Sequence, residues 1–227
     1  MTKPHSHANP AFDRDIKKMS KLLGEMEGAV KYQLVAVSEA FARLDLAQSR
    51  KICKNDKTIN NIRQELEEQT ILLLARHQPM ADDLRHITGA FKASIEYERM
   101  GDYVKHFAKS VGKFAAHHES LEVFPALAEM ETAVRKMYDD FLAAKKDDNT
   151  DAACKVWLSD QKIDDMCHAV VQEAFINQKR GDGNPHSLVR AVSVAKNLER
   201  IGDKIKNLVE IFYYENTGLT LNLEIGD

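Results

Sequence analysis

The chain has 227 residues, of which 44% are hydrophobic and 30% charged, and its formal net charge is −3. This composition suits a buried core and excludes a disordered chain. It offers no basic stripe for nucleic acid, and its apolar runs fall far short of the ~20 residues that cross a membrane. Three cysteines without CxxC spacing, and an N-terminus without a signal-like apolar region, lead us to expect a cytoplasmic protein.

Apolar residues recur every three or four positions in six stretches, which is the pattern of amphipathic helices. Few glycines and prolines interrupt these stretches, so helix is favoured over sheet. Residues 1–10 are polar and precede the first stretch, so we predict a disordered tail there. Five of the six helices are expected at about residues 12–44, 47–76, 82–117, 151–178 and 185–217. The remaining one, the fourth, runs from about residue 127 into the turn-like cluster at 145–150. Further breaks are expected at Pro79, Pro125 and the sequence Gly181-Asp-Gly-Asn-Pro185.

The second half of the chain repeats the first. Residues 98–102 read Glu-Arg-Met-Gly-Asp, and residues 199–203 read Glu-Arg-Ile-Gly-Asp. An earlier Asp-x-x-Ile sequence recurs in the same way, at Asp56 and at Asp160. We therefore predict an all-α fold of two tandem three-helix bundles, with six long helices and an internal pseudo-two-fold repeat. The predicted parts are the tail (1–10), the first three-helix repeat (11–118), the second (119–217) and a C-terminal tail (218–227).

Each predicted repeat places carboxylates on or beside its apolar seam. A Glu and an Asp four residues apart lie one turn apart on the same helix face. Because burying unpaired carboxylates is costly, they must pair with nearby basic residues, face solvent, or bind cations. The nearby basic residues are Arg99, Lys105, Arg200 and Lys204. The candidate metal ligands are Asp56, Glu98 and Asp102 in the first repeat, and Asp160, Asp164, Glu199 and Asp203 in the second.

The ligand types indicate which metals such a site would take. Oxygen ligands suit Mg, Mn, Ca or iron better than thiolate-preferring metals. His106 and Asn207, one turn beyond the motifs, are possible additional ligands. Ferritin-type sites carry Glu-x-x-His pairs, whereas Gly101 and Gly202 stand at the corresponding positions here. We expect both glycines to let a neighbouring helix approach closely, and the residues alone leave metal binding and ordinary ion pairing both open.

Taken together, these features resemble the PhoU family of phosphate-regulatory proteins. The sequence Ala75-Arg-His-Gln-Pro-Met-Ala-Asp-Asp-Leu-Arg85 is similar to the family's Ala-Arg-Arg-Gln-Pro-x-Ala-x-Asp-Leu-Arg. Asn207-Leu-Val-Glu210 is similar to its Asn-Ile-Ala-Glu, and Phe12-Asp13 suits the start of its first helix. The resemblance covers about residues 12–216.

The resemblance implies a cytoplasmic, homodimeric and non-enzymatic negative regulator of the phosphate-starvation response. It implies two partners, the ATPase subunit of a phosphate ABC transporter and a phosphate-sensing histidine kinase. Association with the membrane would then be peripheral, through these partners. The implied protein is a helical signalling adaptor and does not turn over a substrate.

The resemblance also implies metal clusters of Fe, Mn, Mg or Zn on the protein surface. Carried over by motif, the ligands are Glu98, Asp102, Glu199 and Asp203, while Asp160 and Asp164 have the same spacing. In the first repeat Asp56 is followed four residues later by Asn60, a neutral ligand. We therefore expect metal to bind first in the second repeat.

Two other functions stay open at this point. A carboxylate-bridged metal cluster that activates water would make the protein a metallohydrolase or phosphatase, although His106 is the only evident acid–base residue beside the motifs. A purely structural bundle with chance acidic faces would bind no metal.

Overall fold

The computed structural model describes residues 10–117, 124–181 and 184–223, apart from the side chain of Asp56. Six α-helices and no strand are present in these residues, so the predicted all-α fold is confirmed. The first helix begins at Pro10, the last residue of the predicted tail; residues 1–9 lie outside the described part. The helices are α1 (Pro10–Arg43), α2 (Leu46–His77), α3 (Ala81–Ala116), α4 (Pro125–Lys146), α5 (Thr150–Arg180) and α6 (Pro185–Thr217).

Local sequence signals set the ends of several helices. The Asp45 carboxylate accepts a hydrogen bond from the Gln48 backbone N–H at 2.9 Å and so caps the start of α2. Side chains of Asn149 and Asn184 cap α5 and α6 in the same way. Gly181 and Gly218 end these two helices in the left-handed conformation, with φ of 75° and 71°, which glycine adopts without a steric penalty.

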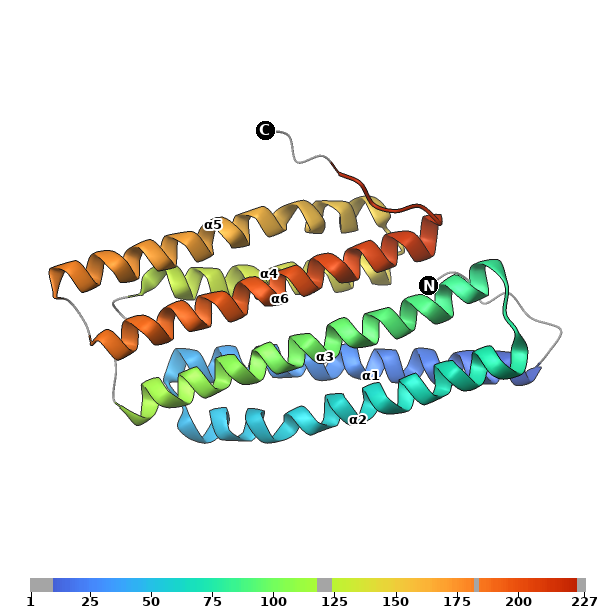
Figure 1. Ribbon diagram of the computed structural model, residues 1–227, viewed down its shortest axis with the longest axis horizontal. Coiled ribbons are helices and arrows are strands. Elements are labelled where there is room, and N and C mark those ends of the chain that lie inside the picture. Colours follow the sequence, from blue (N-terminus) through green and yellow to red (C-terminus); the bar gives the residue numbers. More distant parts are fainter. Residues whose placement is uncertain (1–9, 118–123, 182–183, 224–227) are drawn as a thin grey trace.

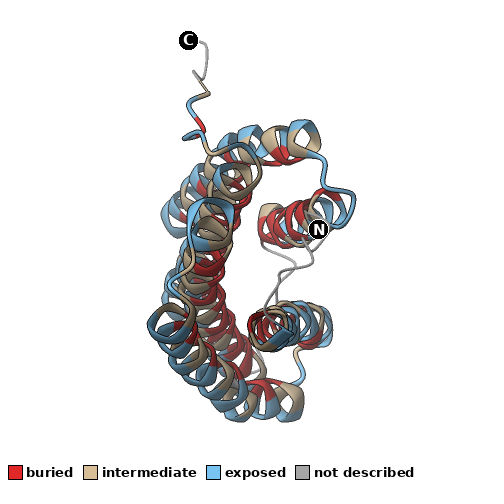
Figure 2. Cartoon of the chain, turned by 90° about the vertical axis from the view of Figure 1, so that its right-hand side faces the viewer, coloured by how far each residue is buried: buried red, intermediate tan, exposed pale blue. Residues whose placement is uncertain are grey.

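Helices α2, α3, α6 and α5 lie side by side in that order and form a curved layer, while α1 and α4 pack on its concave side (Figures 1 and 2). Helices α1 to α3 make one three-helix unit, and α4 to α6 make the other. The third helices of the two units, α3 and α6, run in opposite directions side by side and join the units at the centre (Figure 1). The buried residues line the faces that the two layers turn toward each other (Figure 2).

An aromatic pair joins the first and third helices of each unit. The rings of Phe41 and Phe107 meet edge to face, with centroids 5.3 Å apart, between α1 and α3. Phe141 and Phe212 do the same at 6.4 Å between α4 and α6. All four side chains are buried. Such edge-to-face pairs add to the stability that burial of the rings already provides. In both units they help to hold the first helix against the third along the apolar seams that the sequence predicts.

A polar junction around Glu27 connects α1 with the other unit. The Tyr97 hydroxyl of α3 donates to Glu27 Oε1 at 2.8 Å, and the Tyr138 hydroxyl of α4 donates to the Glu27 backbone carbonyl at 3.2 Å. Lys145 of α4 pairs with the same carboxylate. Burial raises the pKa of Tyr97 and of Tyr138 well above the ordinary value, so both hydroxyls stay protonated donors.

Glu215 of α6 is a second carboxylate in this region. It packs against Gly89 of α3, at a point where a Cβ on residue 89 would collide with the Glu215 carboxylate. Burial raises the pKa of Glu215 to about 7, while Lys145 lowers it and Glu27 raises it further. The absence of a side chain at Gly89 therefore makes room for an acid that burial keeps partly protonated near neutral pH.

Candidate metal-binding faces

The two acidic motifs face different neighbouring helices. Glu98, on α3, faces α2, where Arg63 Nε lies 3.9 Å from Glu98 Oε2. Glu199, on α6, faces α5, where Cys167 Sγ lies 3.3 Å from Glu199 Oε2. Each repeat therefore has its own acidic site. We call Asp56, Glu98 and Asp102 the first acidic face, and Asp160, Asp164, Glu199 and Asp203 the second acidic face; the side chain of Asp56 lies outside the described residues.

Asp160 is the most deeply buried ligand candidate that the structure describes, with 2% of its surface exposed. Its Oδ2 lies 3.3 Å from Lys206 Nζ, whereas its buried Oδ1 has no hydrogen-bond partner among the described residues. Burial raises the pKa of Asp160 to about 6, with Lys206 opposing the shift and Asp164 adding to it. A buried carboxylate oxygen without a donor is costly, and a cation beside it would remove that cost.

Gly202 has the packing role that the sequence predicts. A Cβ at this position would lie 2.9 Å from Asp160 Oδ1 and 3.3 Å from Ile163 Cγ2. The bare backbone of α6 thus allows α5 to approach closely. This approach brings the Asp160 carboxylate of α5 against the middle of the second motif.

The remaining carboxylates of the second acidic face differ in their surroundings. Lys196 Nζ lies 2.6 Å from Glu199 Oε2, and the Cys167 thiol donates to the same oxygen. Burial would raise the pKa of Glu199, but these two hydrogen bonds more than offset it, so the pKa is lowered. Burial raises the pKa of Asp203, Lys204 opposes the shift, and Asp164 adds to it. Burial and the bond to Glu199 raise the pKa of Cys167 to about 11, so the thiol is a neutral donor.

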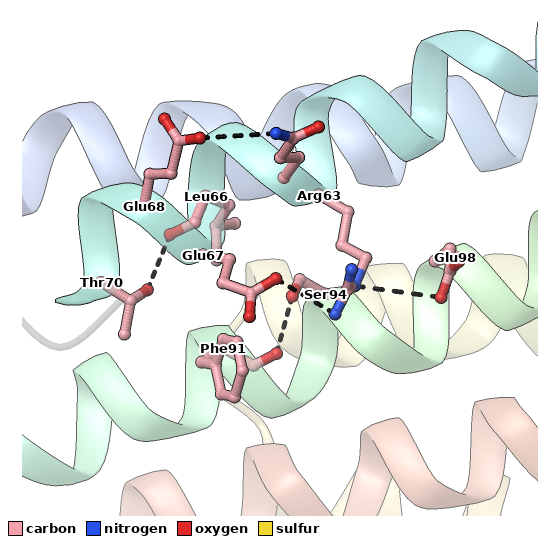
Figure 3. A network of polar contacts seen from close by, with 9 residues as sticks. Arg63, Leu66, Glu67, Glu68, Thr70, Phe91, Ser94 and Glu98 are labelled. Carbon is pink, nitrogen blue, oxygen red and sulfur yellow. Dashed lines mark hydrogen bonds and ion pairs between the residues drawn. The ribbon is translucent and has the colours of Figure 1, made fainter.

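Basic side chains lie beside both described carboxylates of the first acidic face. The Arg63 guanidinium lies between Glu98 and Glu67 (Figure 3), with Nη2 3.2 Å from Glu67 Oε2. Lys105 Nζ lies 3.5 Å from Asp102 Oδ1. The second repeat has a lysine equivalent to Lys105, namely Lys206, but it has Cys167 at the position of Arg63.

Some of the charge partners expected from the sequence are directed elsewhere. Arg99 lies 3.8 Å from the carboxylate of Glu96, and Lys204 lies 3.3 Å from the same residue, which bridges α3 and α6. Arg200 stacks over the Tyr103 ring at 5.7 Å from its centroid. Lys105 does pair with Asp102, as expected.

The two possible additional ligands differ in position. The Asn207 amide donates to Glu96 at 3.0 Å, away from the second acidic face. His106 is exposed. Sequence reasoning missed four residues that contact the acidic faces, although repeat register could have found the first two: Arg63, Cys167, Lys196 and Lys206.

Within the part of the chain that the structure describes, no three His, Cys, Asp or Glu side chains form a group that could hold an ion. Metal binding therefore stays a prediction. It rests on the oxygen-rich donor set of the second acidic face and on the unpartnered oxygen of Asp160, both of which suit a hard cation.

Two segments, residues 23–111 and residues 127–212, match the family model of the PhoU domain. The chain belongs to the PhoU family. It is 30% identical over 212 residues to the phosphate-specific transport system accessory protein PhoU homolog of Zymomonas mobilis, covering 93% of this chain and 89% of the relative. It is 26% identical over 215 residues to the Escherichia coli phosphate-specific transport system accessory protein PhoU, covering 92% and 87%.

Crystal structures of PhoU proteins share the fold. PhoU from Pseudomonas aeruginosa matches with a TM-score of 0.85 at 25% identity, over 92% of this chain and 100% of that one. The phosphate transport system regulatory protein PhoU from Streptococcus pneumoniae matches with a TM-score of 0.84 at 24% identity, over 93% and 100%. The two-repeat helical bundle is thus the architecture of the PhoU family. None of the helices in the described residues is both long and apolar enough to cross a membrane.

Proposed function

We propose that this protein is a regulatory accessory protein of a phosphate transport system and acts in the cytoplasm as an adaptor. It binds both the ATPase subunit of a phosphate ABC transporter and a phosphate-sensing histidine kinase. At high phosphate it represses the phosphate-starvation response. The observation that carries this proposal is the match to the PhoU domain in both repeats. The relatives named above are accessory and regulatory proteins, which supports a role without turnover.

Exposed apolar side chains recur at equivalent positions of the two repeats. Ile71 and Leu72, near the end of α2, are 59% and 40% exposed; Phe175 and Ile176, near the end of α5, are 57% and 46% exposed. Large exposed apolar side chains are where a protein partner gains most on binding. A partner that contains two copies of one subunit suits a chain that presents the same feature twice. We therefore assign these two pairs to the two ATPase subunits of the transporter.

Binding to the isolated ATPase subunit tests this assignment. Replacing Ile71 and Leu72 with Ser, or Phe175 and Ile176 with Ser, should weaken its capture in a pull-down, and the fourfold variant should abolish it. Tyr32→Ser, a change at a side chain 54% exposed on α1, is the matched control. Capture by the fourfold variant at the level of the control would refute the assignment.

The second acidic face is the proposed metal site. Asp160 and Asp164 of α5 and Glu199 and Asp203 of α6 would supply oxygen ligands for a divalent or trivalent ion, drawn from Fe, Mn, Mg or Zn. A bound ion would supply positive charge that neutralises several carboxylates at once. The chain's own contribution is to hold these oxygens on two closely packed helices, which Gly202 permits.

Elemental analysis of the purified protein tests metal binding. We expect bound metal in the native protein and none in a variant with Ala at Glu98, Asp102, Glu199 and Asp203. Equal metal content in the two proteins would contradict the proposal.

The proposal includes the homodimer that the family resemblance implies. Light scattering during size-exclusion chromatography measures its mass, and a monomer mass at all concentrations would exclude the dimer.

The regulatory role is tested in cells. Deletion of the gene should switch on starvation-induced transcription at high phosphate, and the native gene should restore repression. Unchanged transcription after deletion would overturn the adaptor function. Assays of metal-loaded protein on small phosphoesters address the hydrolase alternative, and turnover lost in Glu199→Ala would replace the adaptor proposal.

A further inference from the structure

The two repeats differ at one position beside their acidic motifs. Seven residues after Asp56 the first repeat has Arg63, and seven residues after Asp160 the second repeat has Cys167. Both side chains reach the Glu of their own motif, Glu98 or Glu199. The same place in the two repeats therefore holds a positive charge in one case and a neutral thiol in the other.

Arg63 places a positive charge beside Glu98 of the first acidic face. Its Nε, buried and without a hydrogen bond among the described residues, lies 3.9 Å from Glu98 Oε2, and its Nη2 lies 3.2 Å from Glu67 Oε2. Figure 3 shows the guanidinium between these two carboxylates, which come from neighbouring helices. With Lys105 beside Asp102, each described carboxylate of this face has a cation next to it.

The second acidic face has no comparable balance. Its four carboxylates have two lysines as ion-pair partners, Lys196 at Glu199 and Lys206 at Asp160. Asp160 keeps one buried oxygen without a hydrogen-bond partner among the described residues. Among the described residues, this face therefore carries two more carboxylates than ammonium groups paired with it, since Lys204, which is near Asp203, pairs with Glu96. Asn60 of the first repeat replaces the carboxylate that Asp164 supplies here.

We propose that Arg63 takes the place of a metal ion in the first repeat, so that the chain binds metal in the second repeat only. The inference rests on the proposed metal binding of the second acidic face. A guanidinium beside Glu98 occupies that carboxylate, and its charge repels an arriving cation. Cys167 itself adds no positive charge beside Glu199, whose ion-pair partner is the separate residue Lys196 on α6.

A gain of metal binding tests this assignment. The background variant Asp164→Asn/Asp203→Asn removes two charges from the second acidic face at side chains that are not buried. It should lose its bound Mn²⁺, measured by elemental analysis after desalting. Adding Arg63→Glu or Arg63→Gln to this background should restore bound Mn²⁺. Arg50→Glu, the same change at an exposed position of α2, should restore none.

Two optical readouts accompany the metal analysis. Trp157 is the only tryptophan, and Lys206 Nζ lies 4.3 Å from its ring centroid while also pairing with Asp160. Mn²⁺ binding at the second acidic face should therefore change Trp157 fluorescence in the native protein. Binding gained through Arg63→Glu in the background variant should leave this fluorescence unchanged but should raise the melting temperature. Circular dichroism checks that each variant is folded, and Arg63→Gln, which adds no negative charge, serves if Arg63→Glu fails to fold.

The outcomes separate this inference from the proposed metal function. Loss of Mn²⁺ from the native chain on Glu98→Gln/Asp102→Asn would show metal in the first repeat and overturn the inference. So would Arg63 variants that bind no more Mn²⁺ than the Arg50→Glu control. If the native protein binds no Mn²⁺ but the Arg63 variants do, the metal function of the native chain fails while the assignment of Arg63 stands.

Discussion

Glu215→Gln should stabilise the protein at alkaline pH and have little effect at acidic pH. Glu215 is packed against Gly89, and burial raises its pKa from 4.5 to about 7. For an acid whose pKa is higher in the folded state, the unfolded chain ionises first as pH rises. Stability is therefore lost between about pH 4.5 and 7 and stays low above that range.

The magnitude follows from the size of the shift. A rise of about 2.5 in the pKa of Glu215, at about 1.4 kcal/mol for each pKa unit, gives an upper limit of about 3.5 kcal/mol for the loss of stability at pH 8. At pH 5 the same relation gives a loss of stability of less than about 1 kcal/mol. Glutamine has nearly the shape of glutamate and carries no charge. Glu215→Gln should therefore restore most of the stability that ionisation of Glu215 removes at pH 8, and should raise the melting temperature at that pH by up to about 10 °C.

Urea unfolding of the native protein and the variant at pH 5 and pH 8 measures the effect. Glu25→Gln on α1, at a surface ion pair with Lys21, is the matched control and should change the free energy of unfolding by less than about 0.5 kcal/mol at either pH. A Glu215→Gln effect that is equal at the two pH values would refute the reasoning, because it would not come from ionisation.

Three further predictions concern single contacts, and urea unfolding measures each one. Gly202→Ala places a Cβ 2.9 Å from Asp160 Oδ1 and should lower the free energy of unfolding by about 1–3 kcal/mol. This loss should be smaller in an Asp160→Ala background, and an unchanged loss would exclude the contact with Asp160 as its source. Lys204→Met removes a cation 3.3 Å from the half-buried Glu96 and should lower the free energy of unfolding by about 2 kcal/mol. An unchanged free energy of unfolding would mean that this ion pair between α6 and α3 does not stabilise the protein. Asp45→Ala removes the N-terminal cap of α2 and should cost about 1 kcal/mol, with Asp45→Asn nearly neutral; equal losses in the two would argue against capping.

The sequence by itself was sufficient to predict the six helices and their order. Apolar periodicity, prolines and capping residues are local features of the chain, and they act within a turn or two of helix. The repeat of Glu-Arg-x-Gly-Asp predicted the division into two three-helix units, and the combined motifs pointed to the PhoU family. Asp160 stood in an apolar seam and is buried, as its position in the seam indicates.

Only the tertiary structure showed which charges meet. Arg99 directly follows Glu98 in the chain, yet Arg63 of α2 is the basic residue that reaches Glu98, while Arg99 lies beside Glu96. Contacts of this kind depend on the rotation and offset of one helix against another, which the spacing within a single helix does not specify. The packing of Glu215 against Gly89 joins residues of α6 and α3 in the same way. The chain thus encodes its helices locally, while the charge balance of its two acidic faces arises from how those helices pack.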